Sequence, residues 1–169
     1  MKFPWSGAGL LAGVDKARRR LLGAALAGGG VAALGAASGA RADEDFRFAP
    51  PKHKVVYQFN KADADYHQHV TFSAGEMLRK YGDDVKVVVV CFGPGIHVLA
   101  HFPQRPVSED IQKRIESLAQ YGVEFHACNN TMKSLGWTED DLLPFAKVVD
   151  VGAADLMELQ EQGYAYISW

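Results

Sequence analysis

The segment VKVVVVCF, from Val85 to Phe92, is the feature that most restricts how this chain can fold. It is apolar at nearly every position, so a strand built from it must be covered on both faces. Strands of this kind belong to parallel sheets with helices packed on the two sides. We therefore expect an α/β domain in which the GPG segment at 93–95 ends this strand.

Strand-like and helix-like segments alternate along the rest of the domain. Strands are expected at KVVYQFN, VKVVVVCF, VEFHA, KVVDVG and YAYISW, and helices at about 70–81, 109–121, 131–135 and 153–162. Ser108 has the position of an N-cap, and Thr138 and Asp141 have capping-box spacing. This order predicts a three-layer α/β/α fold with a mainly parallel five-stranded sheet, layered as in flavodoxin.

The first 42 residues have the layout of an export signal. A basic start precedes a run rich in Gly, Ala and Leu, and small residues surround a cleavage site after Ala42. Arg18, Arg19 and Arg20 resemble a twin-arginine signal, although Ala17 stands where Ser or Thr is usual. The alternative is a membrane anchor, for which residues 21–37 are short and glycine-rich.

Cleavage would release a periplasmic protein without stable membrane insertion. It would comprise a linker at 43–53 and one domain at 54–169. The segment before Asp43 holds six of the 18 Lys and Arg residues and one of the 20 acidic residues, which leaves a formal charge of −7. A chain this acidic is not expected to bind nucleic acid.

The chain contains two cysteines, Cys91 and Cys128. Cys91 lies within VVVVCF, so we expect a packed thiol with a raised pKa. Cys128 follows the third expected strand and precedes a short helix, whose first amides favour a thiolate. Position alone leaves both packing and chemistry open for Cys128. Pairing of the two cysteines depends on the strand order, which the sequence does not give.

In parallel α/β folds, the working surface lies beyond the carboxyl ends of the strands. This rule selects residues 60–69, 93–101 and 128–131. His126 is two residues before Cys128, so the two side chains should share one face of a strand, where His126 would add charge or orient the thiol.

Histidines in these segments raise the alternative of a zinc or copper site. His67 and His69 are expected in one loop, and His97 and His101 would share a face if their segment is helical. The four candidate ligands are His97, His101, His126 and Cys128. However, the chain has neither H-E-x-x-H nor C-x-x-C.

Other chemical motifs are missing from the sequence. FGPGIH lacks the third glycine of a dinucleotide-binding turn, and there is no P-loop and no G-x-S-x-G. We therefore expect no nucleotide site and no cofactor.

Four segments together resemble the DsrE/DsrF-like family of small sulfur-relay proteins. They are KVVYQFN, VVVCFGPGIHVL, GVEFHACNNTMKSLGW and EDDLLPFAKVVDVGAADLMELQEQGYAYISW. The resemblance covers residues 54–169. It implies a three-layer fold, assembly into homo- or hetero-oligomers, often trimers or hexamers, and one cysteine that carries persulfide sulfur between partners. Cys128 is the cysteine that falls at that position.

The leading hypothesis is an exported, oligomeric sulfur carrier or sulfurtransferase-like protein. Its donors and acceptors would be proteins or small sulfur compounds outside the cytoplasm. The rivals are a periplasmic metal-binding protein and a non-catalytic assembly subunit. The predicted site residues are Cys128 and His126 as the reactive pair, with Asn129, Asn130, Thr131, Gly93 and Gly95 as substrate-binding residues.

Overall fold

The computed structural model describes residues 50–169, so the export signal and most of the linker expected at 43–53 lie outside the described residues. Five strands form one sheet in the order β4-β3-β2-β1-β5, and every neighbouring pair is parallel. The strands are β1 (His53–Phe59), β2 (Val85–Cys91), β3 (Glu124–Cys128), β4 (Ala146–Val149) and β5 (Ala165–Ile167). The predicted five-stranded parallel sheet is therefore confirmed.

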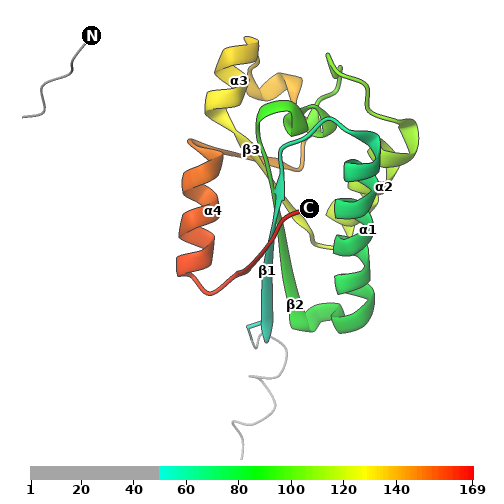
Figure 1. Cartoon of the computed structure of the whole chain (residues 1–169), viewed down its shortest axis with the longest axis vertical. Helices are drawn as coiled ribbons and strands as arrows, with labels where there is room; N and C mark the ends of the chain where they lie inside the picture. Colours follow the sequence, from blue (N-terminus) through cyan, green and yellow to red (C-terminus); the bar gives the residue numbers. More distant parts are fainter. Residues whose placement is uncertain (1–49) are drawn as a thin grey trace, which may run out of the picture. The chain divides into compact units, whose positions relative to one another are not determined.

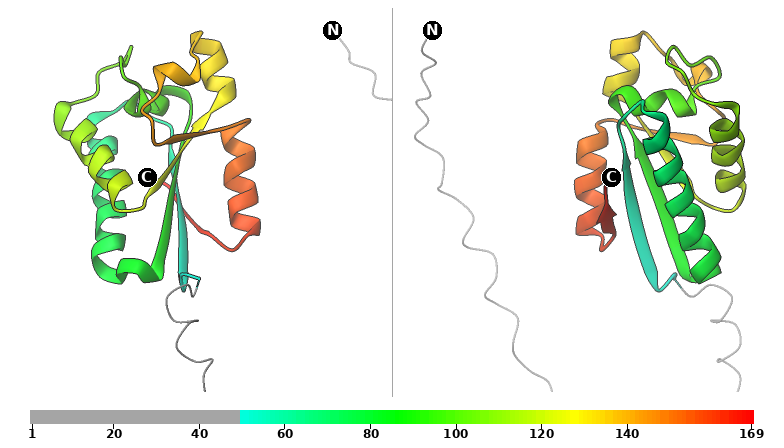
Figure 2. Two further views of the ribbon diagram at one scale, coloured as in Figure 1. Left: turned by 180° about the vertical axis from the view of Figure 1, so that it is seen from behind. Right: turned by 45° about the vertical axis from the view of Figure 1, so that its right-hand side comes forward.

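Helices cover both faces of the sheet, which gives the three layers expected from the sequence (Figure 1). Helices α1 (Ala64–Tyr81) and α2 (Glu109–Gln120) lie on one face, and α4 (Gly152–Glu161) lies on the other (Figures 1 and 2). The short α3 (Asn129–Leu135) sits at the end of the sheet, directly above β3 (Figure 1). None of the helices within residues 50–169 has both the length and the apolar character needed to cross a membrane.

The run of valines in β2 is buried on both faces, as its composition predicts. Val87 and Val89 belong to the main core beneath α1 and α2, whereas Val88 and Val90 belong to a smaller core beneath α4. Each of these side chains is at most 1% exposed. Burial of one such side chain stabilises the fold by roughly 1.5–3 kcal/mol, so this strand anchors both layers.

Local capping sets the start of the two long helices. The Ser108 hydroxyl accepts a hydrogen bond from the Ile111 N–H, so the predicted N-cap of α2 is confirmed. The Asp63 carboxylate accepts a hydrogen bond from the Tyr66 N–H at 2.9 Å. This cap starts α1 at Ala64, six residues before Val70, where the sequence-based helix begins. His67 and His69 consequently lie within α1, and the expectation of a loop there was wrong.

Two further segments differ from the sequence-based expectation. Residues Gly93–Leu99 form a 3-10 helix that begins within the GPG segment, because Pro94 occupies its first turn. The capping box between Thr138 and Asp141 is present, but it caps a 3-10 turn at Glu139–Asp141 rather than an α-helix. Neither difference changes the layers.

All five strands point the same way, so their carboxyl ends meet at one edge of the sheet. Four chain segments leave the sheet at that edge, after β1, β2, β3 and β4. They are Asn60–Asp63, Phe92–Gly95, the start of α3 at Asn129, and Asp150–Gly152. The candidate site lies where the last three of these segments meet.

Candidate functional site

Cys128 is both the last residue of β3 and the N-cap of α3. No loop separates the strand from the helix, so the side chain stays at the carboxyl edge of the sheet while the helix turns above it. The residue is 5% exposed. A helix N-terminus offers N–H groups without intrahelical partners, and these groups are placed around Cys128.

Four N–H and O–H groups around Cys128 act on the pKa of its thiol. Burial alone raises the pKa of the thiol. The Gly152 N–H and the Thr131 N–H and hydroxyl lower it. The Asn130 N–H adds to this effect, although it donates a hydrogen bond to the Asp150 carbonyl oxygen at 3.3 Å. These hydrogen bonds outweigh burial, so the pKa of Cys128 lies below its ordinary value of 9.0. The site therefore favours the thiolate, the form in which a cysteine acts as a nucleophile.

The Thr131 hydroxyl is oriented towards the sulfur by a second contact. Its oxygen accepts a hydrogen bond from the Gly93 N–H at 3.0 Å. Because that contact uses the oxygen as an acceptor, the hydroxyl proton remains available for Cys128. The Gly93 N–H, in the segment after β2, thus polarises the Thr131 hydroxyl of α3. Gly93 acts on the Cys128 sulfur only through this hydroxyl.

Gly152 is the donor that the sequence did not suggest. It is the first residue of α4 and follows the end of β4, which is the neighbour of β3. A Cβ atom at this position would lie 3.2 Å from Cys128 Cβ and 3.1 Å from Phe92 Cδ1. Any larger residue would require Cys128 or Phe92 to shift by a few tenths of an ångström, so glycine allows the closest approach of α4 to Cys128. The strand-end rule, applied to the fourth strand as well, would have selected this residue.

His126 shares the α4 face of β3 with Cys128, as the alternation of strand side chains predicts. The residue is 2% exposed, and its Nδ1 lies 2.7 Å from Asp155 Oδ2 of α4. A carboxylate accepts only, so Nδ1 carries the proton and donates. Nε2 lies 3.6 Å from Glu124 Oε2, which is too far for a hydrogen bond.

The hydrogen bonds that lower the pKa of Cys128 do not include one from His126. Both imidazole nitrogens face carboxylates, so the histidine does not touch the reactive sulfur through either of them. Asp155, its partner, is a second residue of the site that the sequence did not suggest. The sequence places Asp155 in the helix expected at 153–162, but it does not show that this helix packs against β3.

The two cysteines lie on opposite faces of the sheet. Cys91 pairs in register with Ala127, and both belong to the core beneath α1 and α2. Cys128 is the next residue after Ala127, so its side chain points to the α4 face. Both thiols are free, and this register rules out a disulfide between them. Cys91 is fully buried, and burial raises the pKa of its thiol, as the sequence predicted.

The remaining predicted site residues have different surroundings. Gly95 packs against the end of β1, where a Cβ atom would lie 2.3 Å from the Phe59 carbonyl oxygen. Its role is close packing of the backbone. Asn129 is half-buried at the first turn of α3, one residue before the Asn130 N–H that contacts the sulfur.

The alternative metal ligands do not come together. His97 is 3% exposed and its ring packs edge-on against Trp137 at a centroid distance of 5.0 Å, whereas His101 is exposed beyond the end of the 3-10 helix. Among residues 50–169, no three His, Cys, Asp or Glu side chains are placed to hold a metal ion. The structure therefore gives no support to the alternative of a zinc or copper site.

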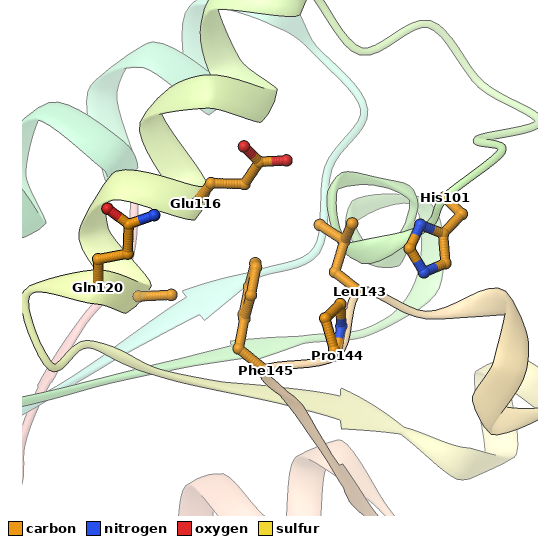
Figure 3. Close-up of a pocket in the computed structure, with 7 residues that line it drawn as sticks. His101, Glu116, Gln120, Leu143, Pro144 and Phe145 are labelled. Carbon is orange, nitrogen blue, oxygen red and sulfur yellow. The ribbon is translucent and has the colours of Figure 1, made fainter.

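A separate groove lies on the α2 side of the molecule (Figure 3). Glu116 and Gln120 of α2 face the segment that leads into β4, with the ring of Phe145 between them and Pro144 (Figure 3). The volume of this groove is about 450 Å³. Cys128 is not among its lining residues, so the groove is distinct from the thiolate site.

The fold and the site together define a class of protein, namely a parallel α/β domain with one cysteine of lowered pKa at the carboxyl edge of its sheet. The model of the DsrE/DsrF-like family matches residues 53–169. The chain belongs to this family, which is linked to sulfur relay. The resemblance seen in the sequence is thus confirmed at the level of the family.

Several solved structures have the same fold. A protein of unknown function from Methanobacterium thermoautotrophicum, MTH1491, is 26% identical, with a TM-score of 0.62 over 69% of this chain and 99% of its own. A conserved protein of unknown function from Bacteroides thetaiotaomicron, BT1422, is 16% identical, with a TM-score of 0.51 over 69% and 94%. The ychN protein of E. coli is 11% identical, with a TM-score of 0.54 over 70% and 99%. No curated protein matches the chain in sequence.

Proposed function

We propose that this protein carries sulfane sulfur as a persulfide on Cys128. The observation that carries the proposal is the position of a single thiol of lowered pKa between the end of β3 and the start of α3, in a chain of a family linked to sulfur relay. A structural cysteine gains nothing from the surrounding N–H and O–H donors, because a neutral thiol is a weak hydrogen-bond acceptor. A thiolate gains from each of them.

The reaction is a transfer of one sulfur atom without net oxidation. The Cys128 thiolate attacks the outer sulfur of a donor such as a polysulfide, a new S–S bond forms, and the donor S–S bond breaks. The leaving thiolate departs with the electron pair of that bond. An acceptor thiolate then attacks the outer sulfur on Cys128, and the original thiolate returns to its amide donors.

The donors also define how sulfur is held. In the persulfide the negative charge lies on the outer sulfur, which is one S–S bond beyond the buried Sγ atom. The Asn130 and Thr131 amides and the Thr131 hydroxyl are at the start of α3, the part of the site nearest the surface. We assign these groups to the outer sulfur or the donor anion, and Asn129 to the rim of the same turn.

Mass spectrometry tests this proposal. The purified protein is treated with polysulfide or thiosulfate, and the intact mass is measured before and after reduction. The wild type and the Cys91→Ala variant should gain one or more sulfur atoms that reduction removes, and Cys128→Ala should gain none. Cys91 is the matched control, because its thiol is buried in the opposite core. Equal gain by Cys128→Ala, or no gain by the wild type, contradicts the proposal.

We further propose that the protein acts outside the cytoplasm as an assembly of identical chains. The twin-arginine-like segment supports export, and exposed large apolar side chains support assembly. These side chains include Phe72, Phe102, Tyr121, Met157 and Trp169. Fractionation of cells that express the full chain tests the compartment, and light scattering of the purified protein tests the assembly. A protein that is cytoplasmic or monomeric at micromolar concentration contradicts the respective part.

A further inference from the structure

Helix α4 reaches the sulfur of Cys128 through its first residue, but its apolar anchors lie elsewhere. Leu156 and Leu159 pack in the small core with Val56, Val88 and Val90, which belong to β1 and β2. In the described part of the chain, that core contains no residue of β3. Apolar packing therefore fixes α4 over two strands. Beside the strand that carries Cys128, the Asn130 N–H donates to the Asp150 carbonyl oxygen at 3.3 Å, which holds the backbone just before α4, and a side-chain contact of α4 itself adds to this hydrogen bond.

The hydrogen bond between Asp155 and His126 is a contact of this kind. Asp155 lies one turn after Gly152 on α4, and His126 lies two residues before Cys128 on β3. The 2.7 Å distance joins a side chain that is 15% exposed to one that is 3% exposed. A charge-assisted hydrogen bond in such a site is short and directional, so it fixes the distance between the two elements.

We propose that Asp155 and His126 are positioning residues, which hold the first turn of α4 so that the Gly152 N–H stays on the Cys128 sulfur. Gly152 fits there with little space to spare, since a Cβ atom would come within 3.2 Å of both Cys128 and Phe92. A small shift of the helix would lengthen the N–H to sulfur contact. The inference rests on the proposed function for its purpose, but its test requires no sulfur transfer.

A direct charge effect predicts the opposite sign, which makes the proposal testable. The groups that face His126 are Asp155 from α4, Glu124 from its own strand, and Lys86 of β2, which pairs with Glu124 at 2.8 Å. A carboxylate near Cys128 disfavours the thiolate, so removing the charge of Asp155 should by itself favour ionisation. Removing a positioning contact should disfavour it.

The experiment is a pH titration of the thiolate by its ultraviolet absorbance, with Cys128→Ala as the baseline. In Asp155→Ala, the midpoint should move to higher pH, and the thiolate fraction at neutral pH should fall about fivefold, as expected for a weakened hydrogen bond to a charged group. Asp155→Asn should keep a midpoint close to that of the wild type, because its amide oxygen still accepts from Nδ1. Glu158→Ala, an exposed acid on the same helix, is the charge-matched control and should change nothing.

A measurement on the wild type covers the case in which Asp155→Ala does not fold. The Gly152 amide resonance in a ¹H–¹⁵N spectrum should move with the same midpoint as Cys128, and in Asp155→Asn it should still do so. The inference is overturned if the Asp155→Ala midpoint is unchanged or lower, if Asp155→Asn shifts as much as Asp155→Ala, or if the Gly152 resonance does not follow the titration. Each of these results leaves the persulfide proposal standing, because that proposal depends on mass gain at Cys128.

Discussion

Replacing Thr131 with valine tests the electrostatics of the site with little change in shape. Valine has nearly the same volume as threonine, and it removes only the hydroxyl that contacts the Cys128 sulfur. The Thr131 N–H remains in place. The change also leaves the Gly93 N–H without its acceptor, which now lies at 3.0 Å.

The magnitude follows from the hydrogen bonds that are lost. A hydrogen bond to a charged group is worth about 1.5–3 kcal/mol, and about 1.36 kcal/mol corresponds to a tenfold change in ionisation. The thiolate fraction of Cys128 at neutral pH should therefore fall roughly tenfold to a hundredfold. The folded protein should lose about 1 kcal/mol in addition, because the Gly93 N–H is no longer paired.

The assay is the rate at which a small alkylating reagent modifies Cys128, measured from acidic to alkaline pH. The midpoint of the rate profile should move to higher pH in Thr131→Val, while the plateau at high pH changes little. Thr131→Ser keeps the hydroxyl and should behave like the wild type. Thr71→Val is the matched control, because the Thr71 hydroxyl bonds only to carbonyls of its own helix. An unchanged midpoint in Thr131→Val refutes the assignment of the hydroxyl as a donor to the sulfur.

Three further changes probe the two thiols and the sheet edge. The pKa of Cys128 is lowered in the folded protein, so ionisation of this thiol stabilises the fold above the ordinary value of 9.0, and the stabilisation is lost as pH falls through the folded pKa. In urea unfolding, the stability advantage of wild type over Cys128→Ala should therefore grow with pH. The pKa of Cys91 is raised, so the neutral thiol stabilises the fold below the ordinary thiol pKa of 9.0, and this stabilisation is lost as pH rises. The stability deficit of Cys91→Ala should therefore shrink in alkaline solution. Gly95→Ala should cost at least about 2 kcal/mol, because its Cβ would lie 2.3 Å from a backbone oxygen, whereas Gly75→Ala in α1, with 3.8 Å to its nearest side chain, should be neutral or stabilising in the same measurement.

The fold was predictable because its main signals are local. The valine run of β2 requires two covered faces, and alternating strands and helices then require parallel pairing. Ser108 marked the start of α2 through a hydrogen bond that spans three residues. The same kind of signal, Asp63 as a cap, starts α1 and was overlooked, which is why His67 and His69 were wrongly expected in a loop.

The site was only partly predictable because it depends on strand order. Cys128, Asn130 and Thr131 are adjacent in sequence, and a strand followed by a helix is enough to gather them. Gly152 and Asp155 come from a segment more than twenty residues later, and they reach Cys128 because β4 is the neighbour of β3. Local patterns do not determine which strands are neighbours. The strand-end rule could have selected Gly152 for the working edge of the sheet, but it could not have placed Gly152 or Asp155 beside the thiol.

Strand register also decides what oxidation can do to the reactive thiol. Cys91 and Cys128 are on neighbouring strands, but a shift of one residue puts their side chains on opposite faces of the sheet. If the protein works outside the cytoplasm, as we propose, Cys128 therefore has no thiol of its own chain with which to form a disulfide. A persulfide on Cys128 is then released by a nucleophile from another molecule, such as the thiolate of an acceptor. The acceptor of the sulfur must reach the carboxyl edge of the sheet, where Cys128 lies.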